Sequence, residues 1–282
     1  MTVCIAAKAL LDDKQVIVTV SDTKITTTHY SQELGAMKIC RVHEFWSTMI
    51  SGRFGQSKPL TTAIKERMAE HTKPSLQEVK TICTSVYIDE AKRLAEQSTI
   101  AKFGMSMEDF LNSRKKIGDS LFERTCGELS RIEVQCDLLM CGFDEDEAHI
   151  FCISNPTTDN PSFITDYDFP GFAAIGTGSY LAESTMYAFQ QTNVTDLNRA
   201  IYHATTAKFI AEAASDVGES TILLVLEGGG YRIGFKEGLE EKLRERWMLK
   251  GRPSVPLDAL TMIDEAIANS TPEPEKPEEA TA

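Results

Sequence analysis

The sequence has no long apolar run and no excess of basic residues. No segment of its 282 residues approaches the roughly 18 consecutive apolar residues of a membrane span. Acidic side chains outnumber basic ones by 42 to 29, which gives a formal net charge of −13. Such a charge repels phosphate backbones and anionic lipids, so the composition argues against nucleic acid and membranes as partners.

A secretory signal and paired cysteine motifs are also missing. The opening residues Met-Thr-Val-Cys-Ile-Ala-Ala-Lys have no basic start and only a short apolar run. The seven cysteines are odd in number, and most lie in apolar segments, where cysteine behaves as a small hydrophobic residue. We therefore expect a reduced, cytoplasmic protein.

Two patterns could suggest a bound ion or cofactor, but neither has the required spacing. Zinc-binding atoms are carried by Cys136, Cys141, His149 and Cys152, which alternate along predicted strands and form no Cys-x-x-Cys knuckle. The glycines at 228–230 are too few for a phosphate-binding loop and are typical of a hairpin turn. The sequence therefore predicts neither a metal nor a cofactor.

What the sequence does contain is an ordered series of strands and helices. Alternation and turn residues predict strands at 2–10, 16–20, 23–34, 37–42, 45–50, 136–143, 149–154, 172–175, 221–226 and 231–235. Helical spacing predicts helices at about 59–71, from a capping box at Ser75 and Glu78 onward, and at 178–190, 196–214 and 237–248.

This order predicts an α+β fold, a four-layer αββα sandwich. Each sheet then has one face covered by the other sheet and one face covered by helices. We expect a single domain at 2–248, with a helical insertion at about 98–134 in which Ser106 and Asp109 could cap a helix. A C-terminal extension at 249–268 follows. The acidic, proline-rich tail at 269–282 has no means of burying a core, so we expect it to be disordered.

Thr2 could supply both a nucleophile and a base. Removal of Met1 would expose an α-amine whose pKa is ordinarily about 7.7–8.0. That amine could accept the proton of the Thr2 hydroxyl as the oxygen attacks a carbonyl group. Chains that begin Met-Thr are common, so this interpretation depends on the residues downstream.

Those residues resemble the proteasomal β-subunits and their bacterial relatives, a family of N-terminal-nucleophile hydrolases. In that family a strand led by threonine is followed by a second strand ending in Asp-Ser-Arg, and then by a lysine and a glycine at near-fixed intervals. Here the second strand ends in Asp22-Thr-Lys24. Lys38 lies 16 residues after Asp22, and Gly52 lies 14 residues after Lys38.

The resemblance implies a role for each of these residues. Asp22 would orient Lys38, and the ammonium group of Lys38 would lower the pKa of the hydroxyl and amine of Thr2. The backbone N–H of Gly52 would stabilise the oxyanion. Taken singly, Asp22 could instead be a turn residue, Lys38 a solvated strand lysine, and Gly52 a strand terminator.

The second half of the chain also resembles the family. The segment Ile175-Gly-Thr-Gly-Ser179 is similar to its glycine-serine-glycine turn, with Thr177 at the position of the serine. Residues 215–221 resemble the segment that brings an aspartate and a serine to the N-terminus. Asp216 with Ser220 or Thr221 would then hold the α-amine, although a helix C-cap and a loop would leave the same pattern.

The resemblance covers about residues 2–97 and 136–248. The chain departs from the family at Lys24, where arginine is usual, at the 98–134 insertion, and in the last 30 residues. The resemblance implies a threonine-type peptidase or amidase that acts on a peptide or small amide substrate and assembles as a homo-oligomer. A catalytically silent assembly subunit and a small-molecule acylase remain as alternatives, and nothing in the sequence indicates whether an unfoldase is a partner.

Overall fold

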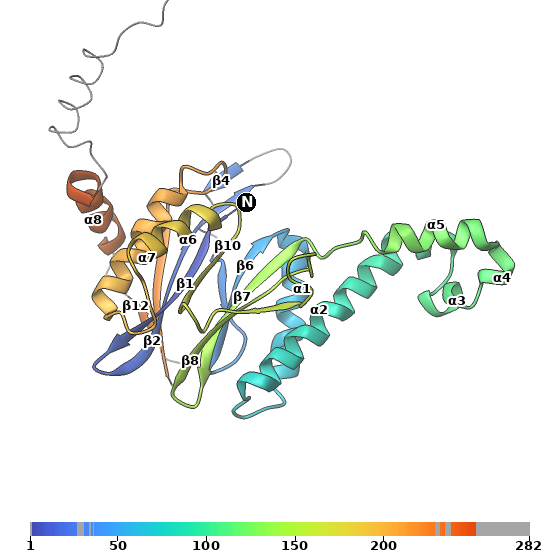
Figure 1. The fold of residues 1–282 in the computed structure, drawn as a ribbon, viewed down its shortest axis with the longest axis horizontal. Coiled ribbons are helices and arrows are strands. Elements are labelled where there is room, and N and C mark those ends of the chain that lie inside the picture. Colours follow the sequence, from blue (N-terminus) through green and yellow to red (C-terminus); the bar gives the residue numbers. More distant parts are fainter. Residues whose placement is uncertain are drawn as a thin grey trace, which may run out of the picture. The chain divides into compact units, whose positions relative to one another are not determined.

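The computed structural model describes residues 2–26, 31–33, 35, 37–228, 232–234 and 238–251 (Figure 1). The chain divides into two compact units, Met1–Arg244 and Glu245–Ala282. The predicted single domain at 2–248 stays a prediction, and the predicted disordered tail lies outside the described residues. Within the described part of the chain, no helix is long and apolar enough to cross a membrane.

Two five-stranded antiparallel sheets form the centre of the first unit. The first has the order β10-β1-β2-β11-β12, with β1 at Cys4–Leu11, β2 at Lys14–Asp22, β10 at Phe172–Ile175, β11 at Thr221–Glu227 and β12 at Arg232–Gly234. The second has the order β5-β6-β7-β8-β9, with β5 at Ile39–Arg41, β6 at Trp46–Gly52, β7 at Cys136–Asp144, β8 at Glu147–Ile153 and β9 at Ile164–Asp166. A separate ribbon pairs β3 (Lys24–Thr26) with β4 (Ser31–Glu33).

The helices lie between these groups of strands in the sequence. They are α1 (Phe54–Met68), α2 (Leu76–Ser98), η1 (Ile100–Phe103), α3 (Met107–Leu111), α4 (Arg114–Ile117), α5 (Asp119–Leu129), α6 (Ser179–Ala188), α7 (Leu197–Ala211), α8 (Leu239–Arg246) and the π-helical segment η2 (Trp247–Gly251). The predicted order of strands and helices is confirmed for most of the described residues. Two differences remain: the single strand predicted at 23–34 is replaced by the two short strands β3 and β4, and the short strand β9 was not predicted.

Three apolar clusters hold the sheets and helices together. One joins the first sheet to α6 and α7, and includes Phe172 and Met186. A second joins the second sheet to α1 and α2, and includes Ile64 and Phe151. The third lies between the two sheets, where Ile17 meets the residues of β7 and β8. The helices on the two outer sides can be followed in Figure 1.

The β1–β2 hairpin sets the position of Thr2. Its turn consists of Asp12 and Asp13, which lie at φ values of 49° and 64°. Aspartate tolerates this left-handed conformation, and such turns match the twist of the paired strands. The resulting register places Cys4 opposite Ser21, so the residues just before Cys4 reach the end of β2, where Asp22 lies.

Helix α1 begins at Phe54, five residues earlier than predicted. Pro59, at the predicted start, lies inside the helix. Arg53, the residue before the helix, fixes this start, because its backbone N–H donates to the carbonyl oxygen of Gln135 at 2.7 Å. The chain therefore turns from β6 into α1 with only Arg53 between them.

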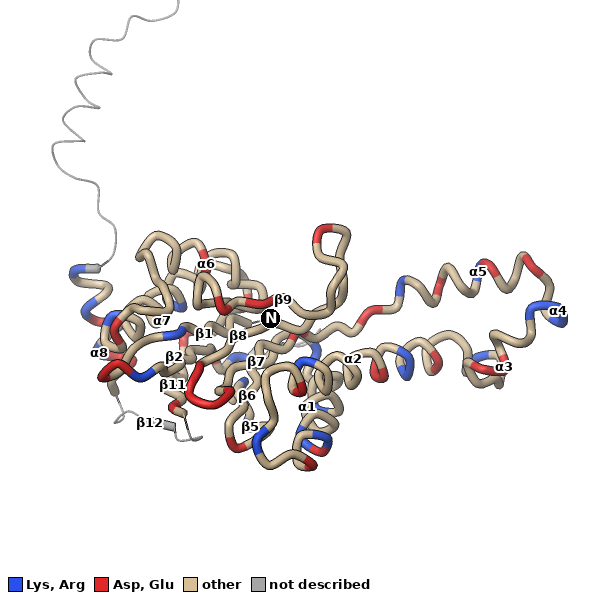
Figure 2. Tube along the Cα trace, turned by 60° about the horizontal axis from the view of Figure 1, so that its bottom comes forward, with Lys and Arg blue, Asp and Glu red and all other residues tan. Residues whose placement is uncertain are grey.

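The predicted insertion at 98–134 contains η1, α3, α4 and α5. The capping boxes predicted at Ser75 and Ser106 are both present. Phe110 stacks on Phe122 at 5.0 Å between ring centroids, so the short helices pack on one another. Figure 2 shows acidic and basic residues interspersed along α2 to α5, which is typical of a solvated surface.

Candidate active site

Thr2 lies two residues before the start of β1 and is almost completely buried. Its carbonyl oxygen accepts a hydrogen bond from the backbone N–H of Gly178 at 3.2 Å. Its hydroxyl group donates to Oδ1 of Asp22 and accepts a hydrogen bond from Nζ of Lys38. The hydroxyl is therefore held between a carboxylate and an ammonium group.

Asp22 ends β2 and is fully buried. Burial alone would raise the pKa of its carboxyl group, but the charge of Lys38 and several hydrogen bonds outweigh burial and lower that pKa. Asp22 is thus ionised at neutral pH. Its two oxygens accept hydrogen bonds from the hydroxyl of Thr2, Nζ of Lys38 (2.7 Å) and the backbone N–H groups of Val3 (3.0 Å), Lys24 (3.1 Å) and Gly218 (3.1 Å).

Lys38 precedes β5 and extends its side chain to both groups. Its Nζ forms an ion pair with Asp22 at 2.7 Å, and its side chain is only 11% exposed. The backbone carbonyl of Lys38 accepts from the N–H of Ile50 at 3.0 Å, which fixes Lys38 to β6. A buried lysine needs a carboxylate partner, and Asp22 supplies it.

Gly52 lies at the end of β6, close to the start of β1. The thiol of Cys4 donates to the carbonyl oxygen of Ile50 at 3.5 Å, so the two strand ends are adjacent. Gly52 has a φ of 95°, and a Cβ atom there would overlap the carbonyl oxygen of Gln135. Backbone packing therefore already requires glycine, and the predicted role of its N–H at an oxyanion stays a prediction.

The turn between β10 and α6 packs directly against Thr2. Gly176 has a φ of 95°, and a Cβ atom there would overlap the carbonyl group of Thr2. Thr177 itself is exposed. In the described part of the chain, no hydrogen bond joins its side chain to Thr2. The glycines, more than Thr177, place this turn beside the N-terminal residue.

The loop between α7 and β11 reaches the site through its backbone. Gly218 donates its N–H to Asp22, whereas Asp216, two residues earlier, is half-buried with a φ of 69°. Ser220 is exposed and directs its hydroxyl group to Glu33. Among the described residues, neither of these two predicted side chains is hydrogen-bonded to Thr2, and their role at the α-amine stays a prediction.

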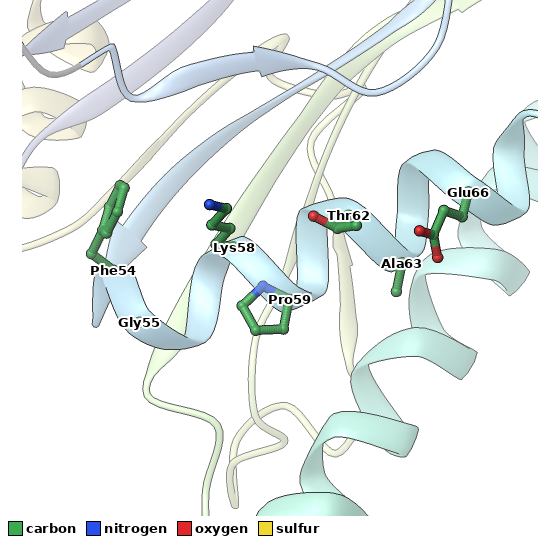
Figure 3. A pocket seen from close by; sticks show the side chains of 7 residues that line it. All are labelled: Phe54, Gly55, Lys58, Pro59, Thr62, Ala63 and Glu66. Carbon is green, nitrogen blue, oxygen red and sulfur yellow. The ribbon is translucent and has the colours of Figure 1, made fainter.

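A surface hollow of about 490 Å³ lies along α1, which begins two residues after Gly52 (Figure 3). Its lining residues are Phe54, Gly55, Lys58, Pro59, Thr62, Ala63 and Glu66. Thr2, Asp22 and Lys38 are not among them. The hollow is therefore separate from the cluster around Thr2, and we assign no substrate to it.

Buried thiols in the neighbourhood are unreactive. Burial raises the pKa of Cys4 to about 12, and it does the same for Cys136. Thiols with such values are protonated at neutral pH and are poor nucleophiles or metal ligands. Within the described ranges, no group of three or more histidine, cysteine, aspartate or glutamate side chains is arranged to hold a metal ion.

Two charged residues near the site were not found from the sequence. Glu33 in β4 and the fully buried Lys208 in α7 both hold the loop at 218–220. Glu33 lies far from that loop in the sequence, and Lys208 lies in a helix without any motif. No local pattern therefore marks either residue. Their neighbours follow only from the way the sheets and helices are assembled.

No protein-family profile matches this sequence, and no curated protein does. Among solved structures, the chain is similar to the Gly-1 mutant of Anbu from Hyphomicrobium sp. strain MC1. The identity is 12% and the TM-score 0.56, with 95% of this chain and 100% of that chain covered. It is also similar to eukaryotic HslV from Trypanosoma brucei, at 17% identity and a TM-score of 0.48, with 80% and 99% covered. The chain has a proteasome-like N-terminal-nucleophile hydrolase fold, which confirms the predicted resemblance at the level of the fold.

Proposed function

We propose that this protein is a threonine-type amidohydrolase that cleaves a peptide or small amide bond with Thr2 as its nucleophile. One observation carries the proposal: the hydroxyl of Thr2 is hydrogen-bonded to both Lys38 and the ionised Asp22 in a buried place. The proteasome-like fold and the three apolar clusters also support the four-layer αββα sandwich that we infer for the domain.

The reaction that we propose begins after Met1 has been removed. The α-amine of Thr2 accepts the proton of the hydroxyl group while Oγ1 attacks the carbonyl carbon of the substrate. Asp22 is a poor base for two reasons. A carboxylate with a lowered pKa binds a proton only weakly, and its oxygens already accept several hydrogen bonds. The ammonium group of Lys38 stabilises the negative charge that develops on Oγ1.

Acyl transfer then proceeds in two halves. In our proposal the N–H of Gly52 donates to the oxyanion, and the departing amine takes the proton from the α-amine of Thr2. The resulting ester on Thr2 is hydrolysed by water, which is activated by the same amine. Thr177, Asp216 and Ser220 are proposed to surround this terminus, although their side chains have no hydrogen bond to Thr2 within the residues described.

Two alternatives belong to the same fold. A catalytically silent assembly subunit would have no need for a buried lysine at the hydroxyl of its second residue, so the Lys38–Thr2 contact favours an enzyme. A small-molecule acylase would use the same chemistry, and would differ only in the walls of the substrate site. Both alternatives make different predictions for covalent labelling and for hydrolysis of peptides.

Intact-mass measurement with a β-lactone tests the proposal. The Thr2 hydroxyl opens the lactone ring, so the protein gains the whole mass of the reagent. We expect a mature chain that begins at Thr2 and one added reagent per chain. Thr2→Ala should abolish both labelling and turnover, whereas Thr81→Ala, at an exposed position on α2, should change neither. An active preparation in which every chain retains Met1 would contradict the mechanism.

We also propose that the protein assembles as a homo-oligomer larger than a dimer. Folds of this layered kind leave helix faces and sheet edges that can be buried between subunits. Exposed aromatic residues on α6, Tyr180 and Tyr187, provide apolar surface for such contacts. Sedimentation analysis that found a stable monomer at micromolar concentration would contradict this proposal.

A further inference from the structure

The loop Gly218–Ser220 fixes the orientation of the Asp22 carboxylate. Oδ1 of Asp22 faces Lys38 and Thr2, whereas the donors to Oδ2 among the described residues are backbone N–H groups, those of Lys24 and Gly218, both at 3.1 Å. The Gly218 bond crosses 196 residues of sequence. If the loop moved, the carboxylate would lose a donor on that side and could rotate away from Lys38.

Glu33 holds this loop and the segment after Asp22 together. Its Oε1 accepts from the backbone N–H of Glu219 at 2.7 Å, and its carboxylate also accepts from both the backbone and the side chain of Ser220. Its Oε2 accepts from the hydroxyl of Thr23, the residue after Asp22, at 2.5 Å. One carboxylate from β4 therefore links the two backbone segments that flank Asp22.

The fit between Glu33 and the loop is close. A Cβ atom at Gly218 would overlap Oε1 of Glu33 and would lie 2.6 Å from Cβ of Lys24, so a side chain at this position would displace its neighbours. Burial would raise the pKa of Glu33, but the hydrogen bonds from Thr23, Glu219 and Ser220 lower it. Glu33 is therefore ionised at neutral pH, and hydrogen bonds to a charged acceptor are stronger than those between neutral groups.

Two cations hold the loop from the carbonyl side of Glu219. The carbonyl oxygen of Glu219 accepts from Nζ of Lys208 and from Nη2 of Arg244, each at 2.6 Å. Both cations also contact the carboxylate of Glu212. Two cations thus bind the carbonyl side of the loop. On the N–H side, Glu33 is the one residue of the described part of the chain whose side chain accepts hydrogen bonds from both the loop and Thr23.

We propose that Glu33 is a positioning residue for the Thr2 site, acting through the loop Gly218–Ser220 and Thr23 on the carboxylate of Asp22. This inference rests on the proposed function of Thr2. Among the described residues, Glu33 has no hydrogen bond or ion pair with Thr2 or Lys38, so we assign it no part in the chemistry. Its effect is on geometry: a displaced Asp22 leaves Lys38 misplaced at the hydroxyl, and misplacement of about 1 Å can cost a reaction up to about a hundredfold in rate.

The test compares Glu33→Ala with Glu33→Gln in the mature protein, using a β-lactone over a range of concentrations. Glutamine can still accept from Glu219 through its carbonyl oxygen, and its amide can donate to the hydroxyl of Thr23. Glu44→Ala is a matched control, because it also removes an exposed carboxylate. Glu44 lies in the turn before β6, at the end of that strand opposite to Gly52. Melting temperatures report whether each variant is folded.

We expect Glu33→Ala to lower the labelling rate at saturating reagent by about tenfold to a hundredfold, with the half-saturating concentration little changed. Glu33→Gln should recover most of that rate, and Glu44→Ala should match the wild type. A folded Glu33→Ala protein labelled at the wild-type rate would overturn the inference, even if its melting temperature fell. So would an equal loss of rate in Glu33→Gln, since the alanine effect would then not come from lost hydrogen bonds.

The failure of the proposed function would have a different signature. In that case the wild type and Thr2→Ala would be labelled alike or not at all, and the inference about Glu33 would fall with it. If instead only the wild type is labelled at Thr2 and Glu33→Ala keeps its rate, the function stands and Glu33 merely joins the ribbon to the loop. The variants therefore separate the two ideas.

Discussion

In the described part of the chain, Lys38 and Lys8 are both largely buried, and each forms an ion pair with an aspartate at almost the same distance. Lys38 lies 2.7 Å from Asp22, and Lys8 lies 2.6 Å from Asp168. The lysines are 11% and 3% exposed, but the carboxylates differ more, with Asp22 fully buried and Asp168 32% exposed. The Asp22 pair shares the hydroxyl of Thr2, whereas Asp168 pairs with the ring of His149 at 2.7 Å.

The difference shows that a buried lysine–aspartate pair is not in itself a catalytic feature. Asp168 also accepts from the backbone N–H of Ile150 at 3.2 Å, so this pair ties β1 and β8 to the segment after β9. Lys8 lies six residues along β1 from Thr2, or about 20 Å at the usual rise of a strand. Only the Asp22 pair contacts a group that can attack a substrate.

The same substitution at both lysines tests this comparison, and Lys38→Met should have the largest effect. Methionine keeps the apolar volume of the stem but removes the ammonium group. We expect labelling of Thr2 and hydrolysis to fall by about a hundredfold or more, on the scale of a lost preorganised donor. Because Asp22 would be left buried without its cation, the free energy of unfolding should also fall by about 3–5 kcal/mol. Near-normal labelling would show that Lys38 is only a strand lysine.

Lys8→Met should lower the stability of the protein without lowering the rate of labelling at Thr2. Asp168 keeps its bonds from His149 and Ile150 and is partly solvated, so we expect a smaller loss of about 1–3 kcal/mol in the free energy of unfolding. The rate of β-lactone labelling at Thr2 should be unchanged in the folded protein. Urea unfolding and intact-mass kinetics on the two methionine variants give both quantities. A loss of labelling in Lys8→Met equal to that in Lys38→Met would remove the distinction.

Much of the fold and part of the candidate site could be predicted from the sequence, because both depend on local patterns. Hairpin turns, capping boxes and apolar spacing gave the order of elements. Asp22 and Lys38, which match the family at these intervals, are both hydrogen-bonded to the hydroxyl of Thr2, and Gly52 lies at the end of β6. Their chemical roles remain predictions.

What could not be predicted depends on contacts between distant segments. In the sequence, nothing distinguishes Lys8 from the other residues of an apolar strand. Its partners Asp168 and His149 come from the segment after β9 and from β8, which are distant in the sequence. Glu33 lies 186 residues from Glu219, and nothing in its neighbourhood marks a binding partner. The start of α1 lies five residues before the predicted one, and Pro59, a residue type favoured in a first turn, lies inside this helix.

The acid stability of the protein offers a finer test of the Lys8 pair. Burial would raise the pKa of Asp168, but hydrogen bonds from His149 and Lys8 and their charges lower it from 3.8 to about 2. As the folded pKa lies below the unfolded one, the stabilisation is present in full above about pH 4. It is lost as the pH falls through about 2, where the folded form is also protonated.

We therefore expect Asp168→Asn to unfold more easily in urea at neutral pH and to lose less stability than the wild type between about pH 4 and pH 2. The slope of stability against pH is the decisive quantity, because the substitution also leaves Lys8 without its carboxylate. Asp22 has a lowered pKa and contributes in the same direction, so some acid dependence should persist in the variant. If the wild type and Asp168→Asn lost stability equally over that range, the Lys8–Asp168–His149 contacts would not stabilise the ionised carboxylate. The comparison between the two lysines would then rest on Lys38 alone.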